Sequence, residues 1–463
     1  MAILHDPLQV FHRVFKLQPR YWRRRRVGSL GPSQVLIGVM TMKVLGTQGY
    51  ERTLDEMRRE LGAVLGWRKP DDVPTASAFC QARRKLSAEA CVELSAQLYD
   101  LCTVSRTHAA IGYAGMRVLA EDGTKLALPA YAGIRAHFGC PSQEKGRELL
   151  GPQASFTVLW DVGANQPVTW RLGPYKESER AHAADMVGSL KSGDLLLCDR
   201  NFLSREYLTQ VVVQQANVLM RVRTSGIGIL KEIKDFITAG INDQTIDLAT
   251  SDEQGRPLVD QPTIRVRLLR APLPNGDFAV FLTTLLDQQR HVAETLINVY
   301  FQRWRIETAF REMKIWHGLE TFHSRSVDGI AQEIAAVMIF LLLASELEAL
   351  VRCAPNEPEK APAQPSPSSP SPSPSPSSPE QKLPASSLQT PNIRFNRRIV
   401  ADCAVNLLYA AMAGRDIRTE FNDAMFRIWR YRQKVRPRRS FPRQRKSAPR
   451  GWKQRGTKGK GRK

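Results

Sequence analysis

The sequence predicts an α/β fold, in which a mixed β-sheet flanked by helices follows a helical N-terminal region. Two observations lead to this prediction. Apolar residues recur at helical spacing through about residue 105, whereas from Met116 onward strand-like apolar runs come first and then alternate with helical segments. Hydrophobic residues make up 42% of the 463 residues and charged residues 24%, so the composition allows a large buried core.

Residues 1–110 form the predicted helical region. Thr75 opens one helix, and Ser87 caps the next, in which Leu94 and Leu98 recur at helical spacing. The basic cluster Arg83-Arg84-Lys85 either faces phosphate groups or lies on a solvated helix face. Composition alone leaves both readings open.

The predicted sheet region covers residues 111–353. Strands are expected at residues 116–128, 155–162, 167–172, 194–199 and 217–223, with helices at 181–190 and 202–215. Residues 225–287 interrupt this alternation with runs rich in Val, Ile and Thr, which predict an inserted antiparallel β region. Two long helices are then expected at residues 292–313 and 327–351.

The C-terminal part has an unusual composition. Sixteen of residues 361–380 are Pro or Ser, so residues 354–392 are expected to be an extended linker. Residues 393–431 have helical periodicity, and residues 432–463 are expected to be a disordered basic tail. Of the net charge of +22, +17 lies between Arg427 and Lys463, so the tail is expected to bind a polyanion.

Several classes of protein are excluded by what the sequence lacks. The seven cysteines are odd in number and include no CxxC pair, which argues against a disulfide framework and a structural zinc site and favours a reducing compartment. No P-loop, HExxH or GxSxG motif is present. The apolar run at residues 335–344 is too short to span a bilayer and predicts a core helix. No targeting signal is expected, and the protein should remain in the cytoplasm.

Two aspartates follow apolar runs in the predicted sheet. Asp122 precedes Gly123 and could belong to a hairpin turn, because Asp-Gly is a common turn pair. Asp199 ends the run Leu195–Cys198 and could cap the next helix. The alternative to both readings is that each residue places a functional carboxylate at a strand end.

A third acid lies on the predicted helix at residues 292–313. With about 100° per residue, Tyr300, Arg303, Glu307 and Lys314 fall within an arc of about 60° next to the apolar stripe. Glu307 would then point toward whatever the helix packs on. The alternative is a surface ladder of ion pairs, and Trp304 is expected to pack in the core although it could stack on an unpaired base.

These motifs resemble those of the DDE transposases encoded by bacterial insertion sequences of the IS-four-like group. The Y-(2)-R-(3)-E-(6)-K signature of that group is matched by Tyr300, Arg303, Glu307 and Lys314. Asp122-Gly123-Thr124 and Asp199-Arg200-Asn201-Phe202 look like its two aspartate motifs, with Asn201 where Gly is usual. Asn tolerates the left-handed conformation better than most residues do. The resemblance spans about residues 75 to 350.

The resemblance implies an RNase H-like catalytic core with an inserted β region. It implies that Asp122, Asp199 and Glu307 are catalytic and bind two divalent metal ions, Mg²⁺ or Mn²⁺. Tyr300, Arg303 and Lys314 would contact DNA, and residues 1–110 would bind the ends of the element.

The function expected from this resemblance is that of a transposase. It would bind terminal inverted repeats, hydrolyse a phosphodiester at each end, and join the freed 3′-OH to target double-stranded DNA, acting as a dimer on DNA in the bacterial nucleoid and at no membrane. The alternatives are an RNase H-like nuclease that lacks strand transfer and an inactive DNA-binding relic.

Overall fold

The computed structural model describes residues 8–14, 30–44, 46, 49–109, 112–141, 151–226, 229–249, 263–273, 276–354 and 393–434. The Pro/Ser-rich linker and the basic tail beyond residue 434 lie outside the described residues. The predictions of an extended linker and a disordered tail therefore stay predictions.

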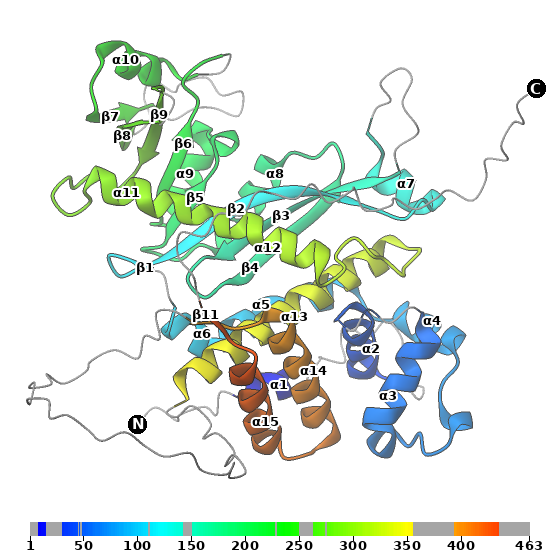
Figure 1. The fold of residues 1–463 in the computed structure, drawn as a ribbon. Coiled ribbons are helices and arrows are strands. Elements are labelled where there is room, and N and C mark those ends of the chain that lie inside the picture. The colour runs from blue at the N-terminus through cyan, green and yellow to red at the C-terminus, as the bar shows by residue number, and fades with distance from the viewer. Residues whose placement is uncertain are drawn as a thin grey trace, which may run out of the picture.

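A mixed nine-stranded sheet forms the centre of the molecule (Figure 1). Its strands are β1 (Gly112–Tyr113), β2 (Met116–Ala127), β3 (Gln153–Asp161), β4 (Gln166–Pro174), β5 (Leu195–Cys198), β6 (Asn217–Val222), β7 (Asp243–Leu248), β8 (Ile264–Pro272) and β9 (Phe278–Thr283). They lie in the order β4-β3-β2-β5-β6-β9-β8-β7, with β1 paired to β2. Strand β3 is antiparallel to both of its neighbours, β2 and β4. Strands β2, β5 and β6 run parallel to one another.

This arrangement agrees with the predicted RNase H-like core. If the two-residue strand β1 is left out, Asp122 lies on the first strand, β2, and Asp199 directly follows the fourth strand, β5. Glu307 lies on a later helix, α12 (Trp304–Ile315). The hairpin-turn alternative for Asp122-Gly123 is wrong, because β2 continues through both residues and pairs with β3 from Leu119 to Ala127 without interruption.

The inserted antiparallel region is present, but it is not a separate sheet. Strands β7, β8 and β9 are antiparallel to one another, and β9 also pairs with β6. Its helix α10 (Lys231–Ala239) is not among the predicted elements. The insertion therefore lengthens the central sheet by three strands.

Helices form a second layer around α13 (Val327–Cys353) (Figure 1). The N-terminal helices are α1 (Gln9–Arg13), α2 (Pro32–Val44), α3 (Tyr50–Leu65), α4 (Ala76–Arg83), α5 (Ala88–Leu101) and α6 (Thr103–Thr107). The predicted caps are present, since the side chains of Thr75 and Ser87 accept from the backbone N–H of Ala78 and Ala90. The C-terminal helices α14 (Arg397–Ala413) and α15 (Ile417–Arg430) join this layer, with α14 packed on α2, α3 and α13.

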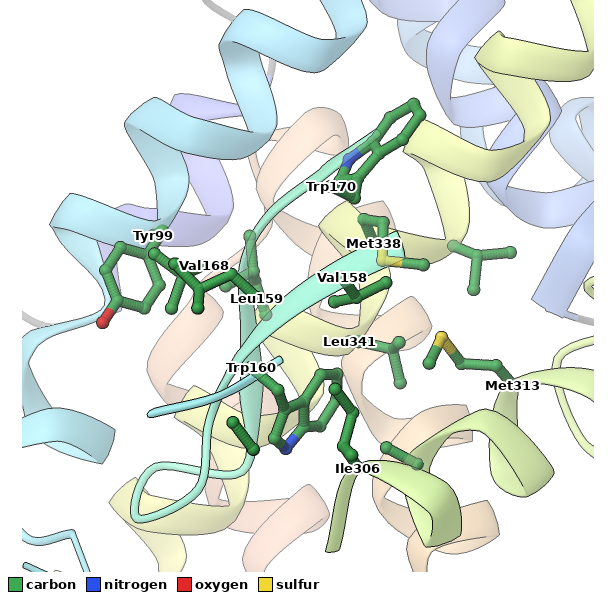
Figure 2. Close-up of a cluster of buried hydrophobic side chains, with 14 of the residues drawn as sticks. Tyr99, Val158, Leu159, Trp160, Val168, Trp170, Ile306, Met313, Met338 and Leu341 are labelled. Carbon is green, nitrogen blue, oxygen red and sulfur yellow. The ribbon is translucent and has the colours of Figure 1, made fainter. Parts of the chain in front are cut away.

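The remaining helices lie along the sheet: α7 (Ala132–Phe138), α8 (Glu179–Met186), α9 (Arg205–Val213), α11 (Ala293–Tyr300) and α12. Figure 2 shows Val158 and Trp160 of β3 packed with Ile306 and Met313 of α12 and Leu341 of α13. One hydrophobic core therefore joins the sheet to the helices that lie along it and to the helices packed around α13. Helix α13 is long and apolar enough to cross a membrane, but 89% of its most apolar window is buried in the protein, so the prediction of a core helix is confirmed.

Arg83 corrects a prediction, because it lies neither on a solvated face nor at a phosphate-binding surface. Its side chain is buried and forms an ion pair of 2.8 Å with the fully buried Glu333 of α13. Lys43 of α2 lies 3.5 Å from the same carboxylate. Burial would raise the pKa of Glu333, but Arg83, hydrogen bonds and Lys43 together lower it to about 2. This ionic cluster fixes α2 and α4 to α13.

Candidate catalytic site

The two aspartates lie at a fork in the sheet. Strands β2 and β5 pair in parallel as far as Glu121, which lies opposite Cys198. Asp122 and Asp199 follow at the next position of each strand, where β5 ends and β2 continues along β3. Because the carboxyl ends of neighbouring parallel strands meet at one edge of a sheet, the fold places both carboxylates at the same crevice.

Arg303 connects the first aspartate with the glutamate. Its Nη1 donates to Oδ2 of Asp122 at 3.1 Å, and its Nη2 donates to Oε1 of Glu307 at 3.0 Å. The guanidinium is 8% exposed, whereas the carboxylates of Asp122 and Glu307 are 19% and 36% exposed. The single cation of Arg303 therefore bridges two of the three predicted catalytic acids.

The prediction of one continuous helix over residues 292–313 is wrong. Helix α11 ends at Tyr300, a 3₁₀ turn η5 covers Phe301–Arg303, and α12 starts at Trp304. A 3₁₀ turn advances about 120° per residue instead of 100°, so its three residues rotate Arg303, Glu307 and Lys314 together by about 60° relative to Tyr300, and the four motif residues still share one narrow arc. The break directs Arg303 toward Asp122 while Glu307 remains one turn farther along α12.

Asp199 caps the helical turn that follows it, which was one of the two alternatives for this residue. Its side chain accepts from the backbone N–H of Arg200 at 2.5 Å, which caps the 3₁₀ turn η4 (Arg200–Phe202). Asn201 lies within this turn and has no positive φ. Its tolerance of the left-handed conformation is therefore not needed, and the site accommodates Asn in place of the usual Gly.

The charges at the fork are not balanced by the protein. Burial raises the pKa of Asp122 to about 6, and the nearby carboxylates of Glu179 and Glu307 raise it as well, while Arg303 lowers it. Carboxylate oxygens are the ligands that Mg²⁺ and Mn²⁺ prefer, so the donor set fits divalent cations. Among the described residues, however, no three acidic, His or Cys side chains converge tightly enough to hold an ion. Cation binding therefore requires these side chains to rearrange.

Tyr300 and Lys314 lie apart from the carboxylates that Arg303 bridges. The Tyr300 ring is buried and packs edge-on against Phe281 at 4.9 Å between centroids, and burial raises the pKa of its hydroxyl. Lys314 Nζ donates to Oγ1 of Thr124 and to the carbonyl of Lys125, each at 3.0 Å. It thus contacts β2 just beyond Asp122.

The structure also shows functional candidates that the sequence reasoning missed. A groove of about 630 Å³ lies next to Asp199, and its basic lining residues are Lys125, Lys176, Arg180, Arg200 and Arg223. The available sequence signal is weak, since Arg221 and Arg223 merely alternate with the buried Val222 on β6. Only the fold brings these separate segments together.

The prediction that Trp304 packs in the core is wrong. Its side chain is 57% exposed, and that of Phe301 in the same turn is 50% exposed. The guanidinium of Arg303 lies 5.8 Å from the Trp304 ring centroid. Two exposed aromatic rings therefore flank the residue that bridges Asp122 and Glu307.

The sequence resembles known transposases in two comparisons. Residues 116–343, which include Asp122, Asp199 and Glu307, match the family described as "Transposase DDE domain". The chain is 22% identical over 294 residues to "Transposase InsG for insertion sequence element IS4" from Escherichia coli (strain K12), and this match spans 62% of the chain and 63% of that relative's length. It is also similar to the cryo-EM structure of the piggyBac transposase synaptic complex with hairpin DNA, with a TM-score of 0.42 and 10% identity over 91% of this chain and 86% of that one.

Proposed function

We propose that this chain is a DDE transposase and that it is the transposase of an insertion sequence. It binds the terminal inverted repeats of its element, hydrolyses a phosphodiester at each end, and joins the freed 3′-OH to target DNA. The observation that supports this proposal most directly is the meeting of Asp122 and Asp199 at the fork between β2 and β5, with Glu307 tied to Asp122 through Arg303.

The three carboxylates provide the chemistry of the site. Asp122, Asp199 and Glu307 would hold two divalent cations, Mg²⁺ or Mn²⁺. Such cations activate the attacking oxygen and stabilise the charge that develops on the leaving oxygen. The partial burial of Asp122 and the neighbouring carboxylate of Glu307 disfavour the negative charge of Asp122, and a bound cation would offset this effect.

Arg303 is placed to contribute to DNA binding. Its guanidinium pairs with Asp122 and Glu307. If divalent cations were held by those carboxylates, the planar guanidinium would be free to donate two hydrogen bonds to a DNA phosphate. Lys314 supplies a second positive charge from its position beside Thr124. The buried Tyr300, whose ring lies 6.0 Å from the Arg303 guanidinium, orients that side chain.

The groove and the exposed rings extend the DNA-binding surface. Arg200 and Arg223 line the groove beside Asp199 and would neutralise backbone phosphates. Trp304 and Phe301 offer exposed rings on which an unpaired base at the cleaved end can stack. The helical N-terminal region reads the ends, the basic tail binds DNA without sequence preference, and two copies bring two ends together in the bacterial cytoplasm at the nucleoid.

The test uses purified protein, DNA fragments that carry the element's own ends, and Mg²⁺. We expect strand breaks at the end boundaries and joined products on a denaturing gel, and neither product from Asp122→Asn, Asp199→Asn or Glu307→Gln, although all three variants still bind the ends. Cleavage without any joined product would favour a nuclease that lacks strand transfer. Absence of cleavage by the wild-type protein under all conditions would favour an inactive relic.

A further inference from the structure

Gly123, which follows Asp122 in β2, is a glycine for a reason other than backbone conformation. The residue lies within a regular strand and its φ is not positive. A β-carbon at this position would lie 2.5 Å from Cδ of Glu179 and 2.7 Å from its Oε1. The Glu179 carboxyl group therefore occupies the space that any other residue would fill.

Glu179 reaches this position from the first turn of α8. Ser178 caps the helix by accepting from the backbone N–H of Ala181, and Glu179 is the next residue. Helix α8 packs against β2 and also against η4, the turn that Asp199 caps (Figure 1). Glu179 thus lies where the two segments that carry the catalytic aspartates approach each other.

The fork in the sheet brings this carboxylate close to Asp122. Beyond Glu121, β2 has lost its partner β5, so one edge of the strand is open. A stabilising charge at the helix N-terminus would explain an acid at this position in sequence, but it would not explain why the side chain turns onto Gly123.

The protein does not balance this additional charge. Among the described residues, Glu179 makes no hydrogen bond or ion pair. Arg303 uses both terminal nitrogens on Asp122 and Glu307, and its buried Nε has no hydrogen-bond partner among the described residues. Lys125 and Arg200 line the same groove as Glu179, but no described residue pairs with its carboxylate, so this carboxylate can take a cationic ligand.

We propose that Glu179 is a fourth acidic residue of the catalytic centre, that its carboxylate contributes to holding the divalent cations at Asp122, Asp199 and Glu307, and that Gly123 provides the room for it. This inference rests on the proposed function, because it assumes that the three acids bind cations. It adds a ligand that the Y-(2)-R-(3)-E-(6)-K and aspartate motifs do not contain.

The test measures Mn²⁺ binding to the full-length protein without DNA, by electron paramagnetic resonance of free Mn²⁺. Glu179→Gln keeps the size of the side chain and removes its charge, and we expect it to weaken Mn²⁺ affinity about 10- to 100-fold, the range seen for residues that support a metal site. The matched control is Glu177→Gln, which removes the same charge two residues away. The carboxylate of Glu177 lies 3.2 Å from Nε2 of His182. This control should bind Mn²⁺ like the wild type.

Gly123→Ala gives an independent variant that keeps the carboxylate. The atoms that the new methyl group displaces are the end of a flexible side chain, so the fold should tolerate the change while Glu179 moves away. We expect weaker Mn²⁺ binding in the wild-type background and no further loss in the Glu179→Gln background, because both changes remove the same interaction.

Two outcomes separate this inference from the proposed function. If Asp122→Asn abolishes Mn²⁺ binding and DNA cleavage but Glu179→Gln binds Mn²⁺ with wild-type affinity, Glu179 is not a ligand and the proposed function stands. If Asp122→Asn leaves Mn²⁺ binding unchanged, the cation site itself is wrong and both proposals fail. Equal losses from Gly123→Ala in the two backgrounds would overturn the role given to Gly123.

Discussion

Replacement of Arg303 by methionine isolates the role of its charge. Methionine has a similar length and is apolar, so Arg303→Met keeps much of the packing and removes both hydrogen bonds to carboxylates. In the cation-free protein, Asp122 and Glu307 then lose their shared partner. We expect the variant to be less stable than the wild type without cations and to gain more stability than the wild type when Mn²⁺ is added.

The size of the effect follows from the exposure of each group. The hydrogen bond to Asp122 joins an 8% exposed guanidinium to a 19% exposed carboxylate and should contribute about 1.5–3 kcal/mol, the range for hydrogen bonds to charged groups. The bond to Glu307 is discounted to about 0–1 kcal/mol, because that carboxylate is 36% exposed and solvent screens it. A total loss of about 1.5–4 kcal/mol corresponds to a fall in Tm of roughly 3 °C or more, at about 2 °C per kcal/mol for a large domain.

The assay is thermal unfolding with and without Mn²⁺. Arg311→Met is the matched control, since Arg311 lies exposed on the same helix and its loss changes the net charge equally. We expect this control to unfold like the wild type in both conditions. An Arg303→Met variant with the wild-type Tm in the absence of cations, or with the same Mn²⁺-induced shift as the wild type, would refute the idea that the guanidinium and the cations compete for the same carboxylates.

Three further predictions concern other parts of the molecule. Glu333→Gln should destabilise the protein by about 3–5 kcal/mol in urea unfolding, because it leaves Arg83 and Lys43 buried without their counter-charge. Since the folded pKa of Glu333 is lowered to about 2, the wild type should lose this stabilisation as the pH falls from about 4.5 toward 2, and the variant should lack that pH dependence. Trp304→Ala should weaken binding to DNA with unpaired end bases by about 1–3 kcal/mol and leave fully paired duplex binding unchanged, and equal losses on both DNAs would contradict base stacking. Arg223→Gln should reduce the salt dependence of duplex binding, log K against log[salt], by a slope of about 0.9, and an unchanged slope would show that the groove does not contact phosphates.

The sequence by itself determined the elements and the chemistry of the site. Hydrophobic periodicity predicted the strands of the core and the buried helix α13, and the caps Thr75 and Ser87 placed two N-terminal helices correctly. The positions of Asp122 and Asp199 after apolar runs predicted that their carboxylates would lie at strand ends, which is correct for Asp199, whereas Asp122 lies within β2 at the point where its neighbour β5 ends. These properties depend on residues within a few positions of one another, and local spacing records them directly.

Only the tertiary structure decided which side chains meet. The sequence did not predict that Arg83 is buried, because its counter-charge, Glu333, is 250 positions away in the chain. Likewise, the sequence allowed Gly123 to be a turn residue. The structure shows that β2 pairs with β3 at Gly123 and that the Glu179 carboxyl group occupies the space beside it. Ion pairs and close contacts between distant segments depend on how whole helices and strands pack, so no local pattern in the sequence predicts them.

The 3₁₀ break between α11 and α12 shows the same limit at short range. Residues 292–313 have helical periodicity throughout, yet the chain tightens at Phe301–Arg303. The tight turn lets Arg303 reach Asp122 from one side of the break while Tyr300 packs on Phe281 from the other. Periodicity measures which residues are apolar, whereas the exact rotation of a helix is fixed by the partners that it must contact, and those come from β2 and β9.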